Sequence, residues 1–247
     1  MFSLNDKNAV VVGGTAGIGL VVAKCYIKAG ASVIICGRRD NGKIVAEEIG
    51  AYFLKLNVTD EGAFSVMLTA AEEKMGKLDI VVLNAGVPGA EDLMENLSSD
   101  CVKDTLDVNV NGVYYGLKYA PVHMNDKGSI IVTSSVSAYQ GSPQSSAYAA
   151  SKAAASALVR AAAIELGPRG IRVNGVAPGG IKTDMALPEE IFTTLTPLAR
   201  MGDPEDLVGI YNLLASDAGA YMTGTDYVVD GGMSSGITFQ TLGKILS

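Results

Sequence analysis

The chain lacks several features on which whole classes of protein depend. It has one histidine, His123, and three cysteines, Cys25, Cys36 and Cys101. A Ser-His-Asp hydrolase would have to use that histidine, but a lone histidine near the expected end of a helix is more often a surface or capping residue. An odd number of widely spaced cysteines fits neither a disulfide framework nor a metal site, so we expect buried thiols and no bound metal.

Positive charge and long apolar runs are also scarce. The 19 Lys and Arg residues are outnumbered by 26 Asp and Glu residues, which gives a net charge of -7. This balance would repel a nucleic-acid backbone, and no apolar stretch approaches the roughly 20 residues that span a bilayer. The first residues also lack the layout of a signal peptide. We therefore expect a cytoplasmic protein with neither a nucleic-acid nor a membrane partner.

Short runs rich in valine and isoleucine alternate with longer helical patterns along the 247 residues. The runs are NAVVV, SVIIC, AYFLKL, DIVVL, SIIVTS, IRVNGVA and YVVD. Such alternation predicts parallel strands joined by helical crossovers, and runs that are apolar throughout predict helices on both sides of the sheet. We predict one α/β domain over residues 1–247, a Rossmann-like doubly wound sheet of about seven strands, with a lid at about 184–203 and a tail at 233–247.

A glycine-rich turn follows the first expected strand. The segment GGTAGIG, residues 13–19, leads directly into the helical stretch LVVAKCYIKAG. Glycines there permit a tight turn and let a pyrophosphate approach the positive N-terminus of a helix. The alternative is that the glycines only make a turn. The segment predicts dinucleotide binding.

The loop after the second expected strand bears on the choice of cofactor. Residues 37–43, GRRDNGK, have P-loop spacing, but Ile44 replaces the Ser or Thr that must ligate Mg²⁺, so we reject nucleotide triphosphate hydrolysis. In a dinucleotide fold this position faces the adenosine ribose, where an acid binds the 2′-OH and an arginine accommodates a 2′-phosphate. Arg38 is present and no acid is. We expect NADP(H) to be preferred over NAD(H), the alternative being solvated surface arginines.

Tyr148 and Lys152 lie four residues apart in an alanine-rich helical segment. This spacing puts both on one face, about 6 Å apart along the axis. A tyrosine that shuttles protons near neutral pH needs its pKa lowered from about 10 by roughly 2 to 3 units, and a nearby ammonium favours the phenolate. Ser135, thirteen residues before Tyr148, could place a hydroxyl beside it. Packing and solvation alone are the alternative.

Taken together, these motifs resemble those of the classical short-chain dehydrogenase/reductases. The similarity extends from Lys7 to about Met233, and its ordered pieces are GGTAGIG, Asn84-Ala85-Gly86, Asn109, Ser135, Tyr148 with Lys152, Pro178-Gly179 and Thr183. The resemblance implies an oxidoreductase that interconverts a carbonyl and an alcohol.

The resemblance also implies a role for each matching residue. Tyr148 would be the general acid/base, Ser135 would hold the carbonyl oxygen, and Asn109 would orient the helix backbone and a water. Lys152 would bind the nicotinamide ribose and lower the pKa of Tyr148. The implied cofactor-binding residues, beside Tyr148 and Lys152, are Gly13, Thr15, Gly17, Ile18, Gly19, Arg38, Asn57, Val58, Asn84, Gly86, Pro178, Gly179 and Thr183.

The sequence departs from the family pattern at three positions. Val12 stands where a threonine is usual, Leu83 replaces the first Asn of N-N-A-G, and Asn57 replaces an aspartate. These changes affect loop-locking and adenine contacts and leave the chemistry intact.

The lid bears on the substrate. Apolar side chains at Met185, Leu187, Ile191, Phe192 and Leu195 favour a hydrophobic ketone or secondary alcohol, unless they only pack the lid. A 3-oxoacyl-carrier-protein reductase is an alternative, supported by Arg169 but opposed by Asn125-Asp126-Lys127 where basic residues are expected. A non-catalytic dinucleotide-sensing regulator is disfavoured by the retained catalytic residues, and the dehalogenase branch by the glycine loop and Lys152.

The resemblance further implies a homotetramer, and the alanine-rich helix would permit close pairing. The last fifteen residues carry large apolar side chains at Ile237, Phe239, Leu242, Ile245 and Leu246. Fully extended, they reach about 50 Å. We expect this tail to pack on a neighbouring subunit rather than to be a frayed terminus.

Overall fold

The computed structural model describes residues 1–186 and 188–246, so the lid residue Leu187 and Ser247 lie outside the described residues, as does the side chain of Leu246. Seven strands form one parallel sheet in the order β3-β2-β1-β4-β5-β6-β7, which confirms the predicted architecture. The strands are β1 (Asn8–Val12), β2 (Ser32–Gly37), β3 (Tyr52–Lys55), β4 (Leu78–Leu83), β5 (Met124–Thr133), β6 (Arg172–Pro178) and β7 (Asp226–Val229).

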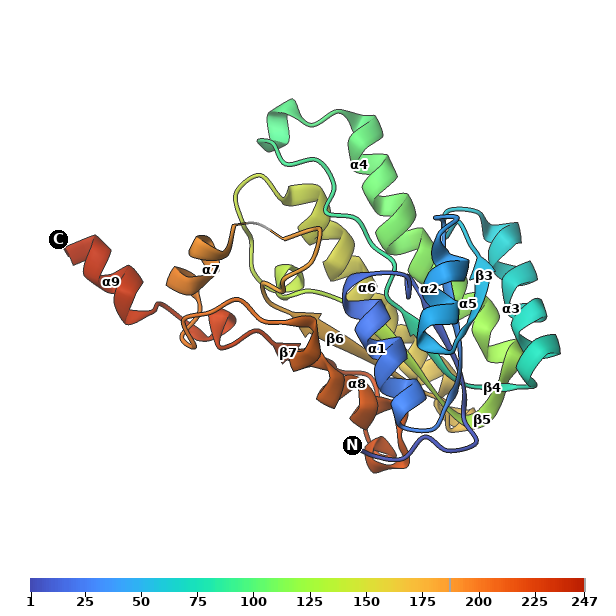
Figure 1. Ribbon diagram of the computed structural model, residues 1–247. Coiled ribbons are helices and arrows are strands. Elements are labelled where there is room, and N and C mark those ends of the chain that lie inside the picture. The colour runs from blue at the N-terminus through green and yellow to red at the C-terminus, as the bar shows by residue number, and fades with distance from the viewer. Residues whose placement is uncertain (187, 247) are drawn as a thin grey trace.

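Helices cover both faces of the sheet (Figure 1). One face is covered by α1 (Gly17–Lys28), α2 (Gly42–Ile49) and α8 (Val208–Ala215). The other is covered by α3 (Glu61–Met75), α5 (Gly112–His123) and α6 (Ser146–Leu166). The remaining α-helices are α4 (Ser99–Leu106), α7 (Glu189–Leu195) and α9 (Phe239–Leu246).

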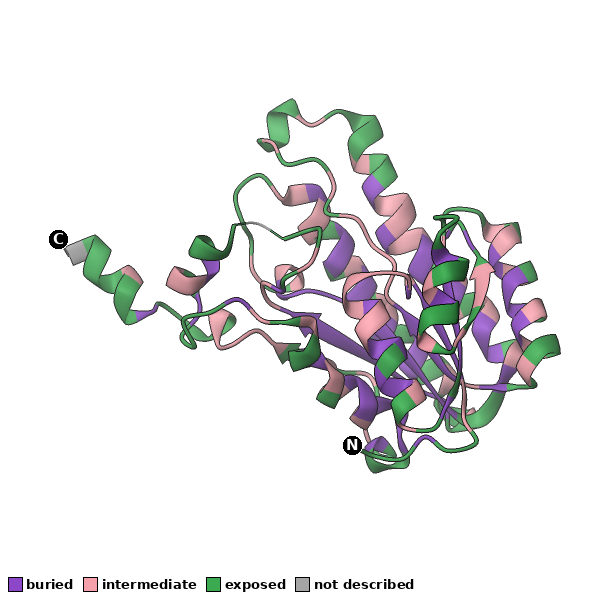
Figure 2. Cartoon of the chain, in the orientation of Figure 1, coloured by how far each residue is buried: buried purple, intermediate pink, exposed green. Residues whose placement is uncertain are grey.

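Two hydrophobic cores lie on opposite faces of the sheet. In β1, Val10 and Val12 enter one core, while Ala9 and Val11 enter the other. All four are at most 2% exposed, because successive side chains of a strand point to opposite faces. Figure 2 shows the buried sheet between helices whose outer surfaces are exposed. Strands that are apolar on both faces are therefore covered by helices on both sides, as the sequence predicted.

The chain order places the functional site. From β1 the chain winds outward to β3 and then returns to β4, which pairs with the other side of β1. Ligands of open α/β sheets bind at such a reversal, outside the carboxyl ends of the strands. The predicted site residues follow β1, β2, β4, β5 and β6 and therefore meet at this edge. Within the described residues, no helix is long and apolar enough to cross a membrane.

The lid and the tail lie outside the main body. The helix α9 projects away from the sheet in Figure 1, and its base is attached to the lid helix α7. The Thr238 hydroxyl donates to the Thr194 carbonyl at 2.7 Å. The tail thus has regular structure, as its apolar composition suggested.

Two surface expectations can be compared with the structure. His123 ends α5, and its Nδ1 lies 2.7 Å from Glu72 Oε2, which agrees with a surface role. Cys25 and Cys36 are buried, but Cys101 is exposed on α4. The expectation of buried thiols was therefore wrong for Cys101, because it lies on an exposed turn of a short helix.

Candidate active site

The glycine-rich loop between β1 and α1 is held in a shape that requires glycine. Gly13 has a φ of 78°, and a Cβ there would lie 2.7 Å from the amide nitrogen of Ala85. The amides of Gly13 and Gly14 both donate to the Cys36 carbonyl. Among the described side chains, none caps the N-terminus of α1, so its first amides remain available to an anion.

Asn84 connects this loop to β5. Its Nδ2 donates to the Gly13 carbonyl at 3.0 Å, and its Oδ1 accepts from the Thr133 hydroxyl at 3.0 Å. One N–H of the carboxamide and one acceptor site of its oxygen are used in these two bonds. Val12 and Leu83, which replace polar family residues, are register partners on β1 and β4. The side chain of Asn84, rather than a side chain at position 12 or 83, fastens the glycine-rich loop to β5.

The adenosine end of the expected site is a pocket of about 570 Å³. Arg38 and Asn57 both line it, although they follow different strands. A Cβ at Gly37 would lie 2.9 Å from the Thr15 hydroxyl, so an acidic side chain has no room at that strand end. The other lining residues are Thr59, Val87, Pro88, Gly89, Ala90, Cys101, Asp104, Thr105, Asp107 and Val108. Val58 is buried beneath the pocket edge and packs beside Gly112.

Ser135 and Tyr148 meet at the carboxyl end of β5. A hydrogen bond joins their side chains and favours a lower pKa for the Tyr148 phenol, but burial outweighs it and raises that pKa. Lys152, one helical turn further along α6, is only 5% exposed. Its ammonium donates to the Thr133 carbonyl at 2.9 Å, and burial lowers its pKa to about 8.

The direction of the Tyr148 shift differs from the expectation. We expected Lys152 to lower the pKa of Tyr148, whereas the structure shows it raised. Lys152 Nζ is directed at the Thr133 carbonyl and lies 5.6 Å from the centre of the Tyr148 ring. At neutral pH Tyr148 therefore holds its proton, which suits a donor to a developing alkoxide.

Asn109 is connected to α6 by hydrogen bonds through Ser151. It lies in a single π-helical turn, Asp107–Asn111, between α4 and α5. Its carboxamide exchanges two hydrogen bonds of 2.9 Å with the backbone of Val87 and donates to the Ser151 hydroxyl at 3.0 Å. Ser151 in turn donates to the Tyr148 carbonyl at 2.7 Å. Such π-bulges often occur at functional sites.

The expected nicotinamide-binding residues approach the same edge of the sheet. A Cβ at Gly17 would lie 3.3 Å from the Thr183 methyl group, so Thr183 reaches the glycine loop. A Cβ at Gly86 would lie 3.3 Å from Asn109 Oδ1 and 3.5 Å from Lys152 Nζ. Pro178 ends β6, with Gly179 packed against Asp230. Ile18 and Gly19 are on the first turn of α1.

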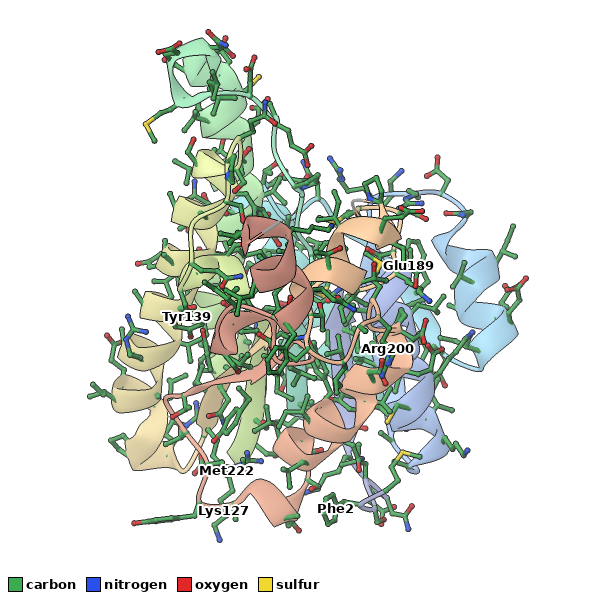
Figure 3. The ribbon with its side chains drawn as sticks, turned by 90° about the vertical axis from the view of Figure 1, so that its left-hand side faces the viewer. Phe2, Lys127, Tyr139, Glu189, Arg200 and Met222 are labelled. Atoms are coloured by element: carbon green, nitrogen blue, oxygen red, sulfur yellow. The ribbon has the colours of Figure 1, made fainter. Side chains whose placement is uncertain are left out.

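Ion pairs join the surface residues of the lid. Lys182 lies 3.1 Å from Glu189 and 3.6 Å from Asp203, and Arg200 forms a bidentate pair with Asp206. In Figure 3, Glu189 and Arg200 lie on one side of the projecting tail helix and Tyr139 lies on the other.

The apolar lid residues differ in what they contact. Phe192 is 9% exposed and packs so closely on Gly180 that a Cβ there would lie 2.2 Å from its ring. Met185, Ile191 and Leu195 are exposed at 45%, 42% and 39%. Packing therefore explains Phe192, and the other three leave apolar surface on the lid.

Sequence reasoning missed three polar residues that hold the site, namely Thr133, Ser151 and Tyr211. Tyr211 on α8 places its hydroxyl 2.7 Å from that of Thr133. No motif or spacing identifies this contact, because the two residues are 78 positions apart.

Comparison with known proteins places this geometry in a family. A family model described as enoyl-(acyl carrier protein) reductase matches residues 13–234. The NADP-dependent (R)-specific alcohol dehydrogenase of Lentilactobacillus kefiri is 36% identical, over 94% of this chain and 98% of its own length. Sorbose reductase of Schizosaccharomyces pombe is 38% identical, over 95% of this chain and 98% of its own.

Solved structures agree with this placement. A short-chain dehydrogenase/reductase from Mycobacterium marinum superposes with a TM-score of 0.88 at 38% identity, covering 95% of this chain and 98% of its own. One from Mycobacterium ulcerans gives a TM-score of 0.92 at 31% identity, covering 96% and 93%. This chain is therefore a member of the short-chain dehydrogenase/reductase family of oxidoreductases.

Proposed function

We propose that this protein is an NADP(H)-dependent carbonyl reductase or alcohol dehydrogenase acting on an apolar ketone or secondary alcohol. The observation that carries the proposal is the cluster of Ser135, Tyr148 and Lys152 beside the glycine loop. When bound there, the nicotinamide exchanges a hydride with the substrate carbon. A proton must be delivered to the substrate oxygen at the same centre.

The side chains divide this work between them. Ser135 positions the substrate oxygen and Tyr148 donates its phenolic proton to that oxygen as negative charge develops. Lys152 would favour the resulting phenolate and bind the nicotinamide ribose. Asn109 holds α6 in place through Ser151, so the phenol and the serine hydroxyl keep their relative positions.

The fit of the cofactor depends on the loop and on the adenosine pocket. The first turn of α1 offers uncapped amides for the diphosphate, with Gly13, Gly17 and Gly19 lining its approach. Arg38 lines the pocket where a 2′-phosphate would lie, and Gly37 leaves no room for a competing acid. One similar protein is named as NADP-dependent, which supports the same preference.

The substrate class follows from the lid. Exposed apolar side chains at Met185, Ile191 and Leu195 can cover an apolar substrate. Similar proteins are named as acting on alcohols, sorbose and hydroxysteroids. Docking of an acidic carrier protein is less well supported, because Arg169 is occupied by Asp126 and by the carbonyls of Pro121 and Met124.

A substrate panel tests this proposal. NADPH oxidation should be measured with apolar ketones, aldehydes, keto sugars and acyl thioesters, and each with NADH as well. We expect the highest kcat/KM for apolar ketones with NADPH. No turnover with any carbonyl, despite cofactor binding, would favour a dinucleotide-sensing role. Preference for acyl thioesters would favour the carrier-protein reductase.

We also propose a cytoplasmic homotetramer whose tail packs on a neighbouring subunit. Ile237, Phe239 and Ile245 are exposed at 72%, 93% and 66%, which is much apolar surface for a projecting helix. Truncation after Met233 should reduce the mass found by light scattering and lower the Tm. Unchanged mass, Tm and KM would remove any role for the tail.

A further inference from the structure

We propose that Thr133 is a positioning residue that couples the glycine-rich loop to the catalytic lysine, with Tyr211 as its support. This inference rests on the proposed binding of NADP(H). Thr133 ends β5, two residues before Ser135. Its carbonyl accepts from Lys152 Nζ at 2.9 Å, and its hydroxyl donates to Asn84 Oδ1 at 3.0 Å. Thr133 thus contacts both the catalytic lysine and the asparagine that holds the glycine-rich loop.

The chemistry of the groups fixes the direction of the hydrogen bonds. Asn84 Nδ2 faces the Gly13 carbonyl, which can only accept, so Oδ1 must face Thr133. The single hydroxyl proton of Thr133 is then used on Asn84. Tyr211 must therefore donate to Thr133 across their 2.7 Å contact. The series of hydrogen bonds runs from Tyr211 through Thr133 and Asn84 to Gly13, and each group donates to the next.

Burial makes this series of hydrogen bonds costly to interrupt. Tyr211 is fully buried and Thr133 is 8% exposed. The Tyr211 carbonyl also accepts from the Tyr26 hydroxyl at 3.1 Å, which ties α8 to α1. Removal of the Thr133 hydroxyl would take a hydrogen-bond partner from the fully buried Tyr211 phenol and from the half-buried Asn84 Oδ1.

The Gly13 and Gly14 amides fasten the loop to β2 through the Cys36 carbonyl, and Asn84 is its attachment on the β4 side. The register pair Val12 and Leu83 is apolar and cannot form a side-chain hydrogen bond. Gly19 is packed so closely that a Cβ would lie 2.2 Å from the Gly13 carbonyl and 2.6 Å from Asn84 Nδ2. Asn84 therefore lies between the loop and the first turn of α1. Its orientation fixes the amides that would receive the diphosphate.

The experiment compares cofactor affinity in matched variants of the full-length protein. Thr133→Val keeps the shape of the side chain and its backbone carbonyl but removes the hydroxyl. We expect the Kd and KM for NADPH to rise about 10-fold. Thr133→Ser should restore affinity to within about twofold. Tyr211→Phe should weaken binding in the same direction by a smaller factor.

Ser129→Ala provides the matched control. Ser129 is on the same strand and is also buried, at 1% exposed, and its hydroxyl donates to the Leu214 carbonyl at 2.8 Å, away from the loop. It should lower Tm without changing the Kd for NADPH. Equal shifts in Kd for Ser129→Ala and Thr133→Val would overturn the inference, as would wild-type Kd in Thr133→Val. If Thr133→Val does not fold, wild-type Kd in Tyr211→Phe overturns it.

These outcomes are distinct from failure of the proposed function. Binding of NADPH is followed by its fluorescence in the absence of substrate, so the result does not depend on knowing the carbonyl compound. A wild-type protein that binds no NADPH would refute the proposed function itself. A wild-type protein that binds NADPH, with no effect of Thr133→Val, would refute only the coupling.

Discussion

The catalytic edge of the sheet and the lid with its tail are stabilised in opposite ways. At the sheet edge, Asn109 and Lys152 are 1% and 5% exposed and have buried hydrogen-bond partners. In the lid and tail, Ile191 and Phe239 are 42% and 93% exposed. Phe192 packs the lid against Gly180, whereas the surface of the lid is joined by ion pairs of half-exposed residues, which contribute little individually.

This difference separates two functional tasks. Proton transfer needs a phenol and a hydroxyl held to a fraction of an ångström, which buried networks provide. Admission of substrate needs a segment that can move, and weakly held surface elements supply it. The same division suggests that changes at the sheet edge affect turnover or cofactor affinity, whereas changes in the lid affect substrate KM.

The largest effect is expected from Tyr148→Phe, which tests whether the rigid half performs the chemistry. The substitution deletes only the proton donor, so kcat should fall by roughly 10²-fold or more while the Kd for NADPH stays unchanged. Stopped-flow or steady-state rates with the best ketone measure it. Tyr114→Phe, on the exposed face of α5, is the control and should keep full activity. Near-normal turnover of the Tyr148 variant would contradict the mechanism.

A second prediction uses the buried charge of Lys152. Its pKa falls from 10.5 in the unfolded chain to about 8 in the fold, so between these values the unfolded state binds more protons. The contribution of Lys152 to stability, taken as the difference between the wild type and a variant without this lysine, should therefore rise with pH from about 8 to about 10.5 by about 3 kcal/mol.

Denaturant titrations of Lys152→Met at several pH values measure this effect. The variant should lack the rise and should also lose turnover, since the lysine ammonium is gone. Lys24→Met, at an exposed position on α1, should keep the rise. A difference in stability between the wild type and Lys152→Met that stays flat from pH 8 to pH 10 would show that the lysine is not destabilised by burial.

The third prediction concerns Arg38 at the adenosine pocket. Charge-assisted hydrogen bonds to a 2′-phosphate are worth about 1.5 to 3 kcal/mol, or roughly 10- to 150-fold in affinity. Arg38→Asp should lose that factor for NADPH and gain for NADH, which has a hydroxyl for the carboxylate. Arg39→Asp, the exposed neighbour, is the control and should have a smaller effect. Equal kcat/KM for both cofactors in the wild type would deny Arg38 this role.

The sequence predicted the strands and helical positions at the sheet edge far better than the hydrogen bonds that connect them. The apolar runs at Asn8–Val12 and Leu78–Leu83 specified buried strands, because local pattern and burial agree there. The spacing of Tyr148 and Lys152 likewise placed them on one helical face. The contact between Thr133 and Tyr211 was not predictable, since it depends on how α8 packs on β5. The π-helical turn at Asn109 and the exposed Cys101 also arise from packing that no local pattern encodes.

The smallest effect is expected in the lid, at Lys182. This residue precedes Thr183 and pairs with Glu189 at the start of α7 and with Asp203 at the far end of the lid. Lys182→Gln removes both pairs, and half-exposed pairs are worth at most about 1 kcal/mol each. Substrate KM should change by less than about 10-fold, with kcat and the Kd for NADPH unaffected. Salt should reproduce part of the change in the wild type, because it screens exposed charges. Arg200→Gln, which removes the neighbouring pair with Asp206, is the matched comparison. A fall in kcat comparable to that of Tyr148→Phe would show that the lid orders the catalytic groups, and the division between a rigid site and a loosely held lid would then not hold.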